Sequence, residues 1–194
     1  MKKYTIIGGM NGVGKSAFSG VLSRMDFELG VIVDADKLTV QNGGDRLSGR
    51  KQAIKIISDC LERGLNFTQE TTLSGKRTLN TMNKAREKGY YIRLFYIGIG
   101  SAEESILRIK NRVRKGGHDI SENDVKRRYE SRFDDLLKIL PYCNEAQFYD
   151  NENGFVYVGE YKCGEIVTAG NYTPSWIKEL YSKNQPCFGK CSKK

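Results

Sequence analysis

The 194-residue sequence has no apolar run long enough to cross a membrane, and it contains only one histidine and three prolines. A transmembrane helix needs about 20 consecutive apolar residues, so the sequence disfavours an integral membrane protein. The five cysteines are an odd number at irregular spacing. This pattern disfavours a disulfide framework and favours a reducing compartment. We therefore expect a cytoplasmic protein.

The sequence also lacks a pattern that would hold a structural metal. Cys187 and Cys191 lie close together near the C-terminus, but the lone His118 is far from them in the sequence. Two thiolates hold zinc only with further ligands, so we do not expect a structural metal. No internal repeat or linker divides the chain. Residues 1–184 are predicted to form one domain, and residues 185–194 a flexible tail.

Predicted strands and helices alternate along the sequence. Short apolar runs predict strands at residues 3–7, 31–33, 65–69, 90–99 and 146–149. Helical spacing of apolar residues predicts helices at 15–25, 51–63, around 79–85, 101–114 and 121–140, with a polar, glycine-rich loop at 41–50. The alternation predicts an α/β fold with a mostly parallel sheet and helices on both faces. Residues 155–158 and 166–169 are predicted to add a C-terminal β-hairpin.

A glycine-rich loop between the first predicted strand and the first predicted helix carries the clearest motif. It reads Gly9-Met10-Asn11-Gly12-Val13-Gly14-Lys15-Ser16 and matches G-x-x-x-x-G-K-[ST] at every fixed position. Backbone N–H groups and the helix N-terminus of such a P-loop bind phosphates. We expect Lys15 to contact the β- and γ-phosphates and Ser16 to bind Mg²⁺. The predicted nucleotide-binding residues are Gly9, Asn11, Gly12, Val13, Gly14, Lys15 and Ser16.

Carboxylates follow the second and third predicted strands. Asp34 and Asp36 end the second, and their side chains face the same side if the strand persists to Asp36. Either carboxylate could take a proton from an attacking hydroxyl or hold Mg²⁺ through water, and a helix cap is the alternative. Glu70 and Thr72 follow the third strand. There Glu70 could orient an acceptor hydroxyl or the water shell of the metal.

Much of the net charge of +9 lies in residues 108–132, which contain nine Lys and Arg residues and only four Asp and Glu residues. Two predicted helices meet there at a glycine pair. Arginines on such helices could form a lid that clamps the transferring phosphoryl group. Two solvated helix faces are the alternative interpretation.

These segments, in this order, resemble the zeta-toxin family of P-loop kinases. The resemblance covers roughly residues 3–170 and is carried by residues 9–16, 33–36, 69–75, 112–120, 127–129 and 149–151. It implies a fold like that of nucleotide kinases, use of ATP or GTP with Mg²⁺, and transfer of the γ-phosphate to a hydroxyl of a small acceptor. The best-known members phosphorylate UDP-N-acetylglucosamine and are inhibited by a small antitoxin. The implied partners are thus a nucleoside triphosphate, a small acceptor and an antitoxin protein.

The resemblance also implies roles for individual residues. Asp36 corresponds to the general base toward the acceptor hydroxyl, and Lys15 to the phosphate-binding lysine. Arg112 corresponds to an arginine that clamps the transferring phosphate. Glu70 and Thr72 correspond to residues of the acceptor site.

The sequence departs from the family pattern at two places. Some members place an arginine in the acceptor site where this sequence has Ser74. The second lid arginine is also not fixed by the match. His118 stands near that position, and Arg127 and Arg128 are the alternatives. These departures concern the identity of the acceptor more than the type of reaction.

A nucleic-acid-binding P-loop ATPase is the rival hypothesis. A basic protein is often a partner of nucleic acid, and residues 108–132 could follow its backbone. However, aromatic and basic residues do not alternate regularly in this sequence, as they would on a surface that stacks bases. We therefore favour the kinase and expect no nucleic-acid partner.

Overall fold

The computed structural model describes residues 1–117 and 119–184. Within them, one seven-stranded sheet has the order β2-β3-β1-β4-β5-β6-β7. The strands are β1 (Lys3–Gly9), β2 (Val31–Asp34), β3 (Phe67–Thr71), β4 (Tyr91–Gly98), β5 (Glu145–Asp150), β6 (Val156–Lys162) and β7 (Glu165–Thr168). Strands β1 to β5 pair in parallel, whereas β6 and β7 are antiparallel. The predicted mostly parallel α/β sheet with a C-terminal hairpin is confirmed.

Helices cover both faces of this sheet. They are α1 (Lys15–Arg24), α2 (Ala35–Gln41), α3 (Arg46–Arg63), α4 (Arg77–Glu87), α5 (Ala102–Arg114), α6 (Glu122–Ile139) and α7 (Ser175–Asn184), with a 3₁₀ turn at Leu140–Tyr142. Successive side chains of β4 alternate between two cores, Leu94 with α3, α4, α6 and α7, and Phe95 with α1 and α5. Two-sided burial explains why β4 is apolar almost throughout.

Local capping signals in the sequence set several helix ends. The Ser101 hydroxyl accepts a hydrogen bond from the Glu104 N–H, and the Ser121 hydroxyl accepts one from the Asp124 N–H. Gly64 ends α3 with a left-handed φ of 68°. The capped ends of α5, α6 and α3 lie within one residue of the predicted helix bounds.

The prediction of a loop at residues 41–50 is wrong. Helix α2 runs to Gln41, and α3 begins at Arg46, five residues earlier than predicted. The Asp45 side chain caps α3 by accepting hydrogen bonds from the Leu47 N–H and the Ser48 hydroxyl. Gly49 lets α2 approach α3, since a Cβ there would lie 2.4 Å from Thr39 Oγ1. The glycine that favoured a loop therefore serves close helix packing.

The extended conformation expected through Asp36 is also wrong. Strand β2 ends at Asp34, and Asp36 lies in the first turn of α2. Asp34 is the N-cap, because its Oδ1 accepts hydrogen bonds from the N–H groups of Asp36 and Lys37 at 2.9 and 3.2 Å. Strand β3, by contrast, runs two residues beyond its predicted end and includes Glu70.

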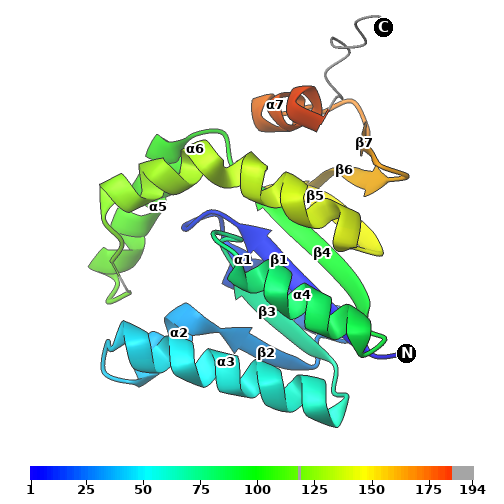
Figure 1. Ribbon diagram of the computed structural model, residues 1–194. Helices are drawn as coiled ribbons and strands as arrows, with labels where there is room; N and C mark the ends of the chain where they lie inside the picture. The colour runs from blue at the N-terminus through cyan, green and yellow to red at the C-terminus, as the bar shows by residue number, and fades with distance from the viewer. Residues whose placement is uncertain (118, 185–194) are drawn as a thin grey trace, which may run out of the picture.

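The carboxyl ends of the parallel strands meet at one edge of the sheet. Figure 1 shows the α2–α3 pair and the α5–α6 pair on either side of this edge. Open α/β sheets bind ligands at this edge. No helix among residues 1–117 and 119–184 is long and apolar enough to span a membrane.

Candidate functional site

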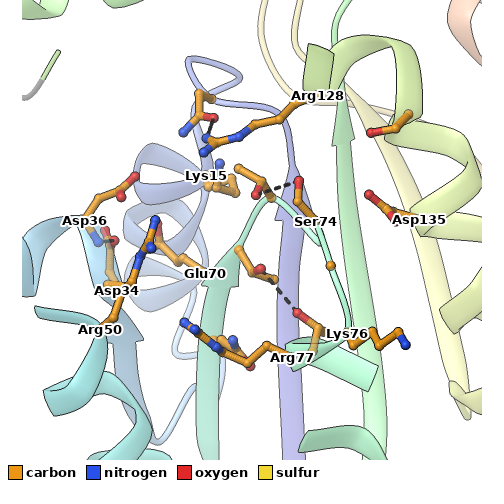
Figure 2. A pocket seen from close by; sticks show the side chains of 18 of the residues that line it. Lys15, Asp34, Asp36, Arg50, Glu70, Ser74, Lys76, Arg77, Arg128 and Asp135 are labelled. Atoms are coloured by element: carbon orange, nitrogen blue, oxygen red, sulfur yellow. Dashed lines mark hydrogen bonds between the residues drawn. The ribbon is translucent and has the colours of Figure 1, made fainter. Parts of the chain in front are cut away.

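A cavity of about 660 Å³ lies at the carboxyl edge of the sheet. Its walls come from the P-loop, the β2–α2 junction, the β3–α4 loop, and helices α3 and α6. It brings together most of the residues singled out in the sequence: Asn11, Lys15, Asp34, Asp36, Glu70, Thr72, Arg127 and Arg128. Figure 2 labels Lys15, Asp34, Asp36, Glu70 and Arg128 among them.

Lys15 lies at the centre of this group. Its ammonium donates hydrogen bonds to the carbonyls of Gly9 and Met10 at 3.0 and 2.8 Å. Burial lowers the pKa of Lys15 below its ordinary value, while the nearby carboxylates of Asp36, Glu70 and Asp34 act in the opposite direction. The lysine is therefore a partly desolvated cation within reach of three acidic side chains.

Two serines of the P-loop helix fix the Glu70 carboxylate. The Ser16 and Ser19 hydroxyls donate to its two oxygens, each at 2.6 Å. Glu70 is 6% exposed, and the parallel pairing of β1 with β3 sets it beside Ile7 at the start of the loop. This geometry directs Glu70 toward the P-loop serine. Of the two roles considered for it, the geometry favours the water shell of a metal over the acceptor.

The oxygen atoms around Ser16 suit Mg²⁺. Ser16 Oγ lies 3.4 Å from Asp34 Oδ2 in addition to its bond with Glu70. In the described ranges no three His, Cys, Asp or Glu side chains form a metal-binding group. Mg²⁺ in kinase sites keeps several waters and binds one or two carboxylates plus phosphate oxygens. The hydroxyl of Ser16 with the carboxylates of Asp34 and Glu70 fits such a site.

Asp34 and Asp36 differ in their surroundings. One oxygen of Asp34 caps α2, and the other approaches Ser16. Asp36 is exposed and lines both the main cavity and a small adjoining one beside Arg46 and Asp124. Asp34 therefore points to the phosphate side, and Asp36 is open to a second ligand.

The β3–α4 loop forms another wall of the cavity. The Thr72 hydroxyl donates to the Ser74 hydroxyl at 3.2 Å, and both side chains line the cavity. Between them Leu73 is 1% exposed with a φ of 65°, a conformation that bulky residues rarely adopt. Burial thus holds Leu73 in this unusual conformation, with the polar side chains of Thr72 and Ser74 lining the cavity on either side of it.

The structure separates the candidate lid residues. Arg128 donates to the P-loop side chain of Asn11 at 2.6 Å, whereas Arg127 pairs with Asp124 at the cavity wall. Arg112 lines a separate cavity of about 480 Å³, not the main one, although its charge lowers the pKa of Lys15. His118 lies outside the described residues, as do Cys187 and Cys191.

Three cationic side chains of the cavity were missed in the sequence: Arg50, Lys76 and Arg77. In Figure 2, Arg50 lies beside the two aspartates, and Lys76 and Arg77 lie at the end away from Arg128. Neither Arg50 nor Arg77 forms an ion pair with any side chain in the described parts of the chain. Arg50 lies in residues 41–50, which the sequence predicts to be a loop, so the sequence could not assign it to a face of a helix.

The chain is similar to a known protein family. The model of the Zeta toxin family matches residues 48–151. An uncharacterized protein of Haemophilus influenzae is 37% identical over 127 residues, which are 62% of this chain and 88% of that protein.

Solved structures share the fold. One belongs to the PezAT chromosomal toxin–antitoxin system of Streptococcus pneumoniae, with a TM-score of 0.63, 19% identity, and coverage of 95% of this chain and 84% of that one. A second is the AvrRxo1-ORF1:-ORF2 structure with ATP, with a TM-score of 0.68, 13% identity, and coverage of 97% and 65%. A third, a putative kinase from Chloroflexus aurantiacus, has a TM-score of 0.52, 16% identity, and coverage of 68% and 77%.

Proposed function

The chain belongs to the zeta-toxin family of P-loop kinases, and we propose that it transfers the γ-phosphate of ATP or GTP to a hydroxyl of a small anionic acceptor such as a UDP-N-acetylglucosamine-like sugar nucleotide. The observation that carries this proposal is the meeting of Lys15, Glu70 and Asp36 in one cavity large enough for a second ligand. Ser16 is tied to this cavity by its hydrogen bond to Glu70. The phosphate-binding loop and the candidate base lie on neighbouring walls of that cavity.

Each residue has a role that follows from its position. The P-loop N–H groups and Lys15 bind the β- and γ-phosphates, and Asp36 accepts the proton of the acceptor hydroxyl. The hydroxyl oxygen then forms a bond to the γ-phosphorus while the bond to the β–γ bridging oxygen breaks. The products are the phosphorylated acceptor and a nucleoside diphosphate. Mg²⁺, held by Ser16 with Asp34 and Glu70 around it, would supply charge neutralisation at the phosphates.

The arginines of α5 and α6 complete the phosphate site. Arg128 is already anchored to Asn11 of the P-loop. Arg112 lines a separate cavity and acts on Lys15 through its charge. Guanidinium groups at these places stabilise negative charge spread over the transferring phosphoryl group.

The far end of the cavity favours an anionic acceptor. Lys76 and Arg77 place two positive charges there, and Arg50 adds a third beside the two aspartates. Guanidinium groups bind phosphate oxygens with two parallel hydrogen bonds. Arg77 also provides a guanidinium to the wall in which Ser74 replaces the arginine of some family members. A sugar nucleotide, with two phosphates and free hydroxyls, suits both ends of such a cavity.

Mass spectrometry of reaction products tests this function. The purified protein is incubated with Mg²⁺ and ATP or GTP, together with UDP-N-acetylglucosamine or with a metabolite extract. We expect one product whose mass is raised by one phosphate, and none with the Lys15→Ala variant. Nucleotide hydrolysis without any phosphorylated product would contradict the proposal.

An inhibitory protein partner is the second part of the proposal. It is supported by the similarity to a structure from the PezAT toxin–antitoxin system. Co-expression of the chain with the protein encoded by a neighbouring gene tests it. Retained kinase activity in the presence of every such protein would argue against an antitoxin.

A further inference from the structure

We propose that Ser105 and Asn151 are positioning residues that aim the N–H groups of the P-loop at the triphosphate. Both contact the loop from the side away from the main cavity, since Asn11 and Lys15 line that cavity and Ser105 and Asn151 do not. The proposal rests on the P-loop as the phosphate site of the proposed kinase and is independent of the acceptor.

Asn151 holds the carbonyl of Val13. Its Nδ2 donates a hydrogen bond to this oxygen at 2.8 Å. The C=O of Val13 and the N–H of Gly14 belong to one trans peptide, so they point to opposite sides of the chain. A carbonyl held toward Asn151 therefore directs the Gly14 N–H away from Asn151, into the loop.

Asn151 is itself rigidly placed at the end of β5. Its N–H donates to the Gly98 carbonyl of β4 at 3.2 Å, and its own carbonyl accepts a hydrogen bond from Arg108 at 2.6 Å. The loop fits closely against it. A Cβ at Gly14, where φ is 92°, would lie 2.7 Å from Asn151 Nδ2. Only glycine at this position allows both the left-handed turn and the contact.

Ser105 holds the carbonyl of Asn11 in the same way. Its hydroxyl donates to this oxygen, and the Ser105 side chain is fully buried. By the same peptide geometry the Gly12 N–H is turned away from α5. A Cβ at Gly12 would lie 2.8 Å from the Ser105 carbonyl. Ser105 belongs to α5, the helix that also carries Arg112, so one hydrogen bond couples this helix to the phosphate loop.

Together the two side chains fix alternate peptides of the loop before any ligand binds. Lys15 adds internal hydrogen bonds to the carbonyls of Gly9 and Met10. Donors that are oriented in advance bind an anion without the cost of ordering them at that moment. Loss of either anchor should therefore weaken triphosphate binding and leave acceptor binding unchanged.

Binding of a fluorescent ATP analogue, mant-ATP with Mg²⁺, tests this in the full chain. We expect Asn151→Ala and Ser105→Ala each to raise the Kd about three- to tenfold, the loss associated with one hydrogen bond. The KM for ATP should rise by a similar factor, with the KM for the acceptor unchanged.

Two matched variants remove equivalent hydrogen bonds away from the loop. Asn144→Ala loses a side-chain bond with the Ile92 N–H at the other end of β5, and Thr68→Val loses a buried hydroxyl bond to the Leu29 carbonyl. Both should lower the melting temperature and keep the wild-type Kd. Should either loop variant be too unstable to purify, the other tests the same loop from the opposite side.

The possible outcomes separate the two proposals. Wild-type Kd values in Asn151→Ala and Ser105→Ala, or an equal loss in the two control variants, would overturn the positioning role and leave the kinase proposal standing. A wild-type protein that binds mant-ATP but phosphorylates no acceptor would contradict the proposed function alone. If the wild-type protein binds no triphosphate, both proposals fail.

Discussion

The two acidic side chains at the start of α2 are held differently, and this difference separates their expected roles. Asp34 uses one oxygen as the helix cap and directs the other toward Ser16. Asp36 is exposed on the first turn and faces the cavity. We therefore expect Asp36, and not Asp34, to act as the base toward the hydroxyl of an acceptor.

Amide substitutions at the two positions test this assignment. We expect Asp36→Asn to keep nucleotide affinity within a few-fold and to lose about 10²–10⁴-fold in transfer rate, the range for removal of a general base. Asp34→Asn should cost less in transfer and raise the Mg²⁺ requirement, because asparagine keeps the cap but removes the charge near Ser16. Product formation at saturating ATP across a Mg²⁺ titration measures both effects. An inactive Asp34→Asn beside an active Asp36→Asn would show that Asp34 is the base.

The lowered pKa of Lys15 predicts that nucleotide binding depends on pH. A triphosphate binds the protonated ammonium, so affinity is present below the pKa of Lys15 in the free protein and is lost as pH rises through it. Because burial lowers that pKa below 10.5, the loss should begin before an ordinary lysine would titrate. Titrations with mant-ATP between about pH 7 and 10 measure this, since carboxylates stay ionised over that range. Lys15→Arg stays charged and should bind independently of pH there; an equal decline in this variant would assign the titration to another group.

At the scale of elements, two helix pairs form the walls of the site. Helices α2 and α3 carry Asp36 and Arg50, and helices α5 and α6 carry Arg112 and Arg128. Arg128 already contacts the P-loop, whereas Arg112 lines a separate cavity. The chemistry of the arginines thus depends on how α5 is placed relative to the loop.

This placement predicts that Arg112 acts mainly during transfer. Arg112→Ala should lower kcat more than it weakens triphosphate binding, since its charge matters most while the phosphoryl group moves between the two oxygens. Separate measurements of Kd by mant-ATP and of kcat by product formation decide the point. Arg114→Ala is a suitable control, because Arg114 is exposed on the same helix and lines neither the main cavity nor the one beside Arg112. An unchanged kcat with lost binding would make Arg112 an affinity residue only.

For the whole molecule, the net charge of +9 is the property that most favours the rival function, nucleic-acid binding. Five of its cationic side chains line the main cavity besides Lys15: Arg50, Lys76, Arg77, Arg127 and Arg128. A concave site lined by cations raises the local concentration of anionic substrates. The two phosphorylated ligands of the proposed kinase would therefore account for part of the charge.

This interpretation predicts weak binding of duplex DNA. A fluorescence-anisotropy titration should show affinity that falls steeply between low and physiological salt, because only counterion release would drive it. The same titration with mant-ATP should be less sensitive to salt. Tight DNA binding that persists at physiological salt, with stimulation of ATP hydrolysis by DNA, would favour the nucleic-acid-dependent ATPase.

The sequence by itself determined the features that depend on neighbouring residues. The P-loop is a contiguous motif whose glycines, lysine and serine lie within eight positions. The alternation of predicted strands and helices indicated a parallel sheet, and capping residues such as Ser101 indicated where helices begin. Periodicity and capping are local, so they can be identified without knowing what packs against them. The same local signal at Asp45 was hidden by the glycines around it.

Only the tertiary structure decided which distant side chains meet. Glu70 reaches Ser16 and Ser19 because β3 lies beside β1, and Arg128 reaches Asn11 because α6 crosses the carboxyl edge of the sheet. Such contacts join residues more than 50 positions apart, and strand order and helix docking set them. No local sequence pattern specifies strand order or helix docking, because the same helices and strands can be connected in several spatial orders. For the same reason Arg50 and Arg77 became candidates for acceptor binding only once α3 and α4 were seen to face one cavity.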